Sequence, residues 1–310
     1  MPKNFPDVWI GRVEKKLTSA DSAPWLDGIP EINGDVVTLG EGTDTEKNII
    51  YVPTTDFEPD VLINNDTYPL ALQEYTDDTA TIALDKYQTK QTSISDDAAM
   101  GASYDKVDAA TGSHTTAILK KKYAKAIHAI APTAHDAAKT PVLKTTGADD
   151  GTGRKMLTRK DLNALKKAFD DLEIPSEGGR RLVLCPDHIN DLLNFDQKFE
   201  NQYYNYTTGK IANVSGFEIY EYVANPYFNA TTGAKKSFGS IPVAGTDFRA
   251  SVAFYAPNIG KKTGKTKQYF SEAKANPGTQ ANTLNYRHYF ICVPKRAEYI
   301  GAIISDKISV

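Results

Sequence analysis

The chain has 310 residues, of which 40% are hydrophobic and 24% charged, and these globular values exclude wholesale disorder. Its 36 basic and 39 acidic residues give a formal net charge of −3, which argues against a dedicated nucleic-acid-binding protein. No apolar run approaches the length of a membrane span, and the first twenty residues lack the apolar core of a signal peptide. With only two cysteines and therefore no disulfide framework, we expect a soluble protein kept in a reducing cytoplasm.

The charge is distributed unevenly along the chain. Residues 1–94 contain 7 basic and 17 acidic residues, a net charge of −10, whereas residues 95–310 contain 29 and 22, a net charge of +7. A split of this kind is typical of a surface that meets another charged surface.

The first third of the chain has the pattern of extended structure. Proline and glycine interrupt residues 1–46 too often for long elements, so this segment is predicted to be an arm. Residues 47–56 and 79–94 favour β-strands, and the tip between them, residues 57–78, contains two prolines. Because a lone two-stranded ribbon is marginally stable in water, we expect this hairpin to rest on another part of the protein.

Residues 95–130 carry the strongest helix signal. Acidic residues lie in the first half and lysines near the end, an order that complements the helix dipole. An apolar stripe on one face predicts the helix core: Tyr104, Val107, Ile118 and Ile127. We expect this stripe to pack on a strand near residues 286–293.

The remaining elements mix without a βαβ rhythm, so the predicted class is α+β. After a linker, Thr158 is predicted to cap one helix, and Asp187 a second, shorter one. The predicted elements are helices at 158–171 and after 187, strands at 180–186, 216–223, 250–257, 286–294 and 298–304, and a basic loop at 258–285.

No group of residues has the pattern of a catalytic, cofactor or metal site. The segment 260–266 resembles a phosphate-binding loop, but only three residues separate its glycines where four are needed. Cys185 and His188 lie close in sequence without a family signature, and a buried structural cysteine is the favoured interpretation. His114 and His128 are nearly four helical turns apart, too far to bind one metal. We therefore expect no enzyme activity and no cofactor.

The order of elements resembles that of the major capsid proteins of tailed bacteriophages, which have the Hong Kong 97 (Johnson) fold. The segment ISDDAAMGASYDKVDAATGSHTTAILKKKYAKAIHAIA looks like the spine helix of that family, and TRKDLNALKKAFDDLEIPSEGGRRLVLCPDHINDLL looks like part of its axial domain. The resemblance implies an N-terminal arm at 1–46, an E-loop at 47–94, a peripheral (P) domain with the spine helix at 95–150, an axial (A) domain at 151–249, P-domain strands with the basic loop at 250–293, and a C-terminal strand returning to the A-domain at 294–310.

The same resemblance implies a structural protein that assembles into hexamers and pentamers of a head shell enclosing double-stranded DNA. Its implied partners are other copies of itself, a scaffolding protein, a portal, decoration proteins and non-specifically packaged DNA, with no membrane. It would be made in the host bacterial cytoplasm and reside in the virion capsid. In this family the E-loop reaches neighbouring subunits, so the expected inter-subunit contacts are Glu58, Asp60, Asp77 and Asp78.

Three alternatives remain open from the residues. An encapsulin-like compartment protein would have the same fold. A nucleotide-using enzyme would depend on residues 260–266. A surface carbohydrate-binding protein would explain the glycosylation sequons and the tyrosine clusters, but it needs an export signal.

Overall fold

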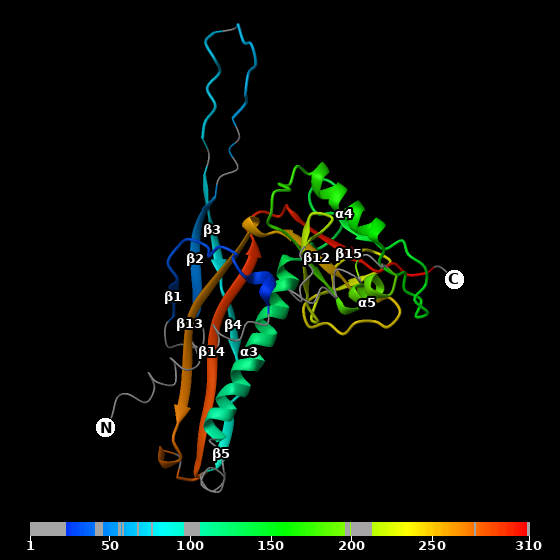
Figure 1. The fold of residues 1–310 in the computed structure, drawn as a ribbon. Helices are drawn as coiled ribbons and strands as arrows, with labels where there is room; N and C mark the ends of the chain where they lie inside the picture. The colour runs from blue at the N-terminus through cyan, green and yellow to red at the C-terminus, as the bar shows by residue number, and fades with distance from the viewer. Residues whose placement is uncertain are drawn as a thin grey trace.

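The computed structural model describes residues 23–40, 46–54, 57, 59–66, 68–75, 77–95, 106–195, 199, 213–275 and 277–308. Two parts are visible in Figure 1: an elongated half built on long strands, from which a loop projects, and a compact half that contains the carboxyl terminus. Helices and strands alternate irregularly in both halves. The predicted α+β class is therefore confirmed.

The elongated half is organised around an antiparallel ribbon of two long strands, β13 (Ile259–Ser271) and β14 (Ala281–Pro294). The prediction of a basic loop at 258–285 is therefore wrong, because most of that segment is strand. Its glycines, which suggested a loop, lie where other segments cross the ribbon. A Cβ atom on Gly264 would come within 2.8 Å of Asn48 Nδ2, and one on Gly260 within 2.5 Å of Ile32 Cγ1.

One face of the ribbon is covered by the long helix α3 (Lys106–Ile130), which runs beside β14 in Figure 1. Ile118 and Ile127 are buried in one apolar cluster with Tyr286 and Phe290 of β14. Val107 packs half-buried against that cluster, whereas Tyr104 lies outside the described residues. Alternate residues of a strand point to opposite faces, so the even-numbered side chains of β14 form the surface that receives the helix.

The opposite face of the ribbon carries a three-stranded sheet formed by β1 (Val37–Leu39), β2 (Lys47–Thr54) and β3 (Asp78–Ala83). A small separate cluster of Ile32, Ile50, Leu84 and Tyr289 joins this sheet to the ribbon. Beside it the buried carboxylate of Glu46 accepts hydrogen bonds from Lys267 Nζ at 2.8 Å and from the Tyr289 hydroxyl at 3.2 Å. Apolar packing and a buried ion pair therefore hold the sheet in place.

The single strand predicted at 79–94 is in fact three strands. After β3 the chain turns inward at the buried Leu84, whose amide donates to the Asn48 carbonyl at 2.8 Å. It then leaves the three-stranded sheet and pairs with the edge of β14 as β4 (Asp85–Gln88) and β5 (Thr92–Ser95). The alternation of side chains along the sequence continues from β3 into β4. The sequence pattern therefore does not reveal that the chain changes from one sheet to the other.

The compact half is a six-stranded mixed sheet with helices packed on it. The apolar face of α4 (Arg159–Asp171) contributes Leu165 and Phe169 to the second large cluster, where they meet Leu182 and Phe217 of the sheet. In order across the sheet the strands are β6 (Val142–Lys144), β15 (Ile300–Ile304), β12 (Ser251–Tyr255), β7 (Arg180–Leu184), β9 (Phe217–Glu221) and β8 (Asn213–Val214). Smaller elements are α5 (Pro186–Phe195), β10 (Tyr227–Asn229), β11 (Asp247–Arg249) and the 3-10 turns η1 (Pro24–Leu26), η2 (Ala256–Asn258) and η3 (Ala273–Ala275).

The two predicted helix caps have different outcomes. Thr158 precedes α4 with an extended backbone, and its amide donates to the carboxylate of Asp161 at 2.9 Å, so this cap is confirmed. Asp187 does not cap α5, because the helix already begins at Pro186 and Asp187 lies in its first turn. An acidic residue there still complements the helix dipole.

A buried polar network closes the compact half. Arg154 donates two hydrogen bonds to the carboxylate of Asp191 on α5, both at 2.8 Å. The imidazole of His188 lies between the hydroxyls of Ser251 at 2.7 Å and Ser305 at 2.9 Å. These contacts tie α5 to β12 and to the residue that follows β15, and burial lowers the pKa of His188 to about 4.

We expect Ile118→Asp to abolish soluble folded subunit, because an unpaired charge would be placed in the apolar cluster beneath α3. Thr116→Asp introduces the same charge at an exposed position two residues earlier and serves as the matched control. Soluble yield and the urea unfolding transition are the measurements. Folded protein from the Ile118 variant would show that this face of α3 does not need burial.

Stability should fall as the pH decreases from about 6.5 to about 4, in part because of His188. Its pKa is about 4 when folded and about 6.5 when exposed, so in this range the unfolded chain binds more protons. Below about pH 4 both states are protonated and this contribution stops changing. Urea unfolding at several pH values should show a flatter profile for His188→Gln than for the parent. Parallel profiles for parent and His188→Gln would refute this assignment.

Candidate functional site

The feature that stands out is the loop between β2 and β3, which projects beyond the last strand pair, Thr54 with Asp78 (Figure 1). Its large apolar side chains are exposed to between 58% and 90%: Val61, Leu62, Ile63, Tyr68, Leu70, Leu72 and Tyr75. A concentration of exposed apolar side chains of this size marks an interaction surface. We call residues 57–78 the projecting loop.

The two limbs of the projecting loop contact each other. The Asp60 amide donates to Gln73 Oε1 at 3.0 Å, and Gln73 Nε2 donates back to the Asp60 carboxylate at 2.5 Å. Near the base, the rings of Phe57 and Tyr75 meet edge to face with centroids 5.5 Å apart. These contacts hold the limbs together while leaving the apolar side chains outside.

The projecting loop is also acidic, with six acidic residues and no basic one. Of the residues expected to contact neighbouring subunits, Asp60, Asp77 and Asp78 are exposed here, and Glu58 lies outside the described residues. The apolar side chains of the same loop are not among the predicted contacts, although the run Val61-Leu62-Ile63 is visible in the sequence. Charge and apolar surface therefore occur together.

Other acidic residues of the first 94 have partners inside the chain. Asp85 forms an ion pair with Lys125 of α3 at 2.6 Å, and Glu46 forms one with Lys267 of β13 at 2.8 Å. The charge asymmetry of the sequence is therefore partly balanced within one subunit.

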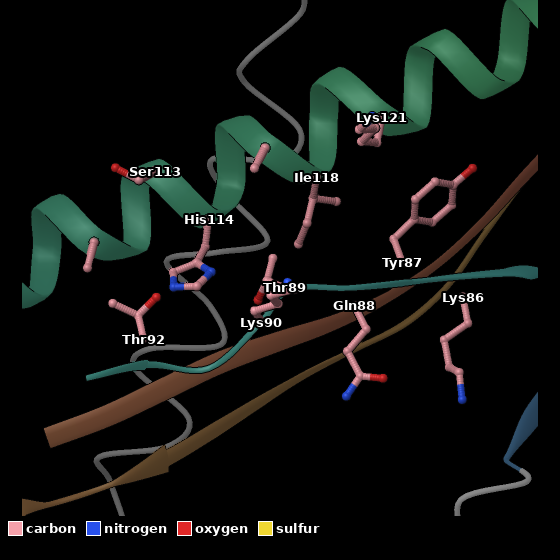
Figure 2. Close-up of a pocket in the computed structure, with 12 residues that line it drawn as sticks. Lys86, Tyr87, Gln88, Thr89, Lys90, Thr92, Ser113, His114, Ile118 and Lys121 are labelled. Carbon is pink, nitrogen blue, oxygen red and sulfur yellow. The ribbon is translucent and has the colours of Figure 1, made fainter. Parts of the chain in front are cut away.

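A groove lies between α3 and the segment 86–92 of β4 and β5, with a volume of about 760 Å³. Figure 2 shows Tyr87 directed from the strand toward the helix, and His114 and Ile118 directed from the helix toward the strand. Exposed Lys90 and Lys121 also line it. Burial lowers the pKa of His114, so this imidazole is neutral near pH 7.

The residues considered for catalysis do not form a reactive site. Cys185 is fully buried, and burial raises the pKa of its thiol to about 11, so it is not a thiolate nucleophile at neutral pH. His188 is engaged by two serine hydroxyls. Residues 260–266 lie within β13 and form no loop that could wrap a phosphate, which overturns the nucleotide alternative.

The metal and membrane possibilities find no support in the described part of the chain. His128 Nε2 bonds the Lys236 carbonyl at 2.8 Å, while His114, nearer the start of α3, contacts the ring of Tyr286 on β14 with the centroids 5.5 Å apart. Within the described ranges, no three His, Cys, Asp or Glu residues are grouped as metal ligands would be. Nor does any described helix combine the length and apolar content needed to cross a bilayer.

Similar folds occur in several solved structures. The capsid of an empty GTA particle matches with a TM-score of 0.60 and 10% identity, over 90% of this chain and 88% of that one. Mycobacterium phage Bobi matches with a TM-score of 0.56 and 12% identity, over 94% and 93%. A virus-like particle from Pyrococcus furiosus matches with a TM-score of 0.54 and 10% identity, over 97% and 99%. At these identities the matches show a shared fold.

Sequence comparison is more specific. No curated protein matches the chain. A family model described as phage capsid protein, however, matches residues 76–305, which include β4, α3, the β13–β14 ribbon and the whole compact half. The predicted resemblance is thereby confirmed, and the chain belongs to the phage capsid protein family.

Proposed function

We propose that copies of this capsid protein assemble as hexamers and pentamers into a bacteriophage head shell that encloses double-stranded DNA. The observation that carries the proposal is the projecting loop, whose large apolar side chains are exposed to solvent in the single subunit. Exposing apolar side chains to water is unfavourable in free energy, and burying them between subunits removes this unfavourable contribution. Each subunit would thus be completed by its neighbours.

The domain assignment follows from the same proposal. The arm would comprise residues 1–46 and the E-loop residues 47–94, with the projecting loop as its tip. The P-domain would comprise 95–150 with α3 as the spine helix, together with 250–293. The A-domain would comprise 151–249, and residues 294–310 would return to it, as β15 does between β6 and β12.

Further partners belong to the proposal as well. A shell of this kind needs a scaffolding protein to set its curvature, a portal for DNA entry and, in some cases, decoration proteins. Assembly would take place in the cytoplasm of the host bacterium.

One observation favours a second candidate, an encapsulin-like compartment. The virus-like particle from Pyrococcus furiosus is matched over almost the full length of both chains. Electron microscopy of particles purified from cells carrying the complete gene cluster separates the two. DNA-filled heads with a portal would support the phage shell, and closed particles that hold protein and no DNA would support the compartment.

Replacing residues 57–77 by a short glycine-containing turn should prevent shell formation while leaving the subunit folded. The segment removed lies beyond the last strand pair, and none of its described residues belongs to the three apolar clusters. The free energy of unfolding of the isolated subunit should change by no more than about 0.5 kcal/mol. Negative-stain microscopy detects the shells, and normal shells from this variant would refute the role given to the loop.

Reversing the charge of the projecting loop should slow assembly in dilute buffer, as high salt does for the parent. Surface attraction is screened beyond about 8 Å at physiological salt and about 3 Å at 1 M. Light scattering across a sodium chloride series would compare the parent with Glu58→Lys, Asp60→Lys, Asp77→Lys and Asp78→Lys combined. The matched control reverses four exposed acids elsewhere: Asp35, Glu177, Glu221 and Glu272.

If assembly strengthens with salt and the loop variant behaves like its parent, apolar burial dominates the contacts. If the control variant slows equally, net charge matters and the position of the charges does not. Either result contradicts the electrostatic role of the loop.

A further inference from the structure

We propose that the groove between α3 and β4–β5 binds the phosphate backbone of double-stranded DNA. This inference rests on the proposed function, because it names the surface that the enclosed DNA contacts. It concerns residues 86–92 of the strand segment and 110–121 of the helix. The net charge of the chain is −3, so the site is local. Weak binding is sufficient there, because DNA confined within a shell has a high effective concentration.

Lysines without an ion-pair partner line the groove. Lys86 and Lys90 come from the strand segment and Lys121 from the helix, and all three are exposed. Figure 2 shows Lys86 leaving the strand on the side away from the helix, so this lysine forms the outer rim. None of the three is paired with an acidic residue that the structure describes. The neighbouring Asp85 is paired instead with Lys125, at 2.6 Å. The described part of the subunit therefore leaves this positive charge available to a ligand.

Inside the groove lies a buried polar side chain that lacks a partner. His114 is only 8% exposed, and Figure 2 shows its ring directed from the helix toward the strand. The ring contacts that of Tyr286, but its nitrogens have no hydrogen-bond partner among the described residues. A neutral imidazole carries one N–H donor, and buried donors ordinarily have an acceptor. An oxygen atom of a ligand in the groove would supply that acceptor.

The other polar side chains favour a phosphate backbone over an acidic peptide. Gln88 and Thr92 line the strand wall and Ser113 the helix wall, and each can donate a hydrogen bond. No carboxylate is among the described residues that line the groove. A phosphodiester backbone presents oxygen acceptors, which lysines bind through charge-assisted hydrogen bonds. A peptide would in addition bring N–H groups that need acceptors of their own.

The length of the groove fits several successive phosphates. Residues 110–121 of α3 span about 17 Å, because a helix rises 1.5 Å per residue. Each strand of a DNA duplex has one phosphate per about 3.4 Å of axis, so up to about five phosphates pass along this length. Ala110 and Ala117 are small, which keeps the space between the walls open. A single strand of the duplex can therefore lie between the helix and β4–β5.

Duplex binding by the isolated subunit tests the proposal. The groove variant is Lys90→Gln with Lys121→Gln, and its control is Lys160→Gln with Lys307→Gln, which removes the same charge from exposed positions of the compact half. Fluorescence anisotropy of a labelled duplex at about 50 mM salt gives the affinities. We expect the groove variant to bind at least about tenfold more weakly than the parent and the control to bind like the parent.

The salt dependence gives a second readout, which a misfolded groove would not reproduce. Each phosphate contacted by a cation adds about −0.9 to the slope of log K against log salt concentration. Loss of two lysines should therefore make the slope shallower by about 1.8, whereas Lys90→Arg with Lys121→Arg should retain the parent slope. His114→Leu removes a donor that is neutral near pH 7, so it should weaken binding and leave the slope unchanged.

The outcomes separate this inference from the proposed function. If the groove variant binds the duplex like the parent, or the control loses as much affinity, the groove assignment fails and the head shell stands. If the groove variant no longer forms shells, the groove is a contact between subunits, and the assignment fails as well. Competition by poly-L-glutamate as strong as by unlabelled duplex of equal charge would also overturn it. If particles from cells are closed and hold no DNA, the proposed function fails and this inference with it.

Discussion

The fold depends on one constraint: a two-stranded ribbon as long as β13–β14 cannot remain in water on its own. Each face must be covered, and the chain covers them with different devices. Helix α3 supplies an apolar stripe to one face, and the β1–β2–β3 sheet lies across the other. The edge is extended by β4 and β5. Most of the elongated half can be understood as cover for this ribbon.

The covering sheet is held by a mixture of forces that differ in strength. Its apolar cluster is small, and the buried carboxylate of Glu46 adds an ion pair with Lys267 that is only partly shielded from water. Burying a carboxylate is costly, and the cation and hydroxyl around it offset that cost. Gly264 completes the arrangement, because a side chain there would collide with Asn48 and Leu84. Asn48 and Leu84 can therefore approach β13 this closely only because residue 264 is a glycine.

Much of the fold could be predicted from local signals. The Thr158 cap, the apolar spacing of α4 and the strands β7, β9, β12 and β15 follow from patterns of neighbouring residues, and the order of elements indicates the family. The ribbon is not predictable from local signals, because Gly260 and Gly264 act through contacts with Ile32 and Asn48, which are distant in sequence. Short β6 lies in the segment before Thr158 that the sequence pattern predicts as a linker, because its partner β15 is distant in sequence.

The projecting loop and the groove, too, can be predicted only in part from the sequence. The acids of the projecting loop were identified from sequence, since charge is a property of single residues. The significance of its apolar side chains depends on their exposure, which only the structure gives. The groove could not be predicted at all, because it forms where 86–92 and 110–121 meet in space.

The division of the interior into three apolar clusters also bears on motion. The cluster of Ile32, Ile50, Leu84 and Tyr289 is much smaller than the other two, and among the described residues it is the cluster that joins the covering sheet to the ribbon. Proteins open in cooperative units whose stability follows their buried contacts. Amide protons of β1, β2 and β3 should thus exchange with solvent deuterium through partial opening, whereas those of α3 and β12 should wait for global unfolding. A subunit built in this way can reorient its outermost part without dismantling its interior.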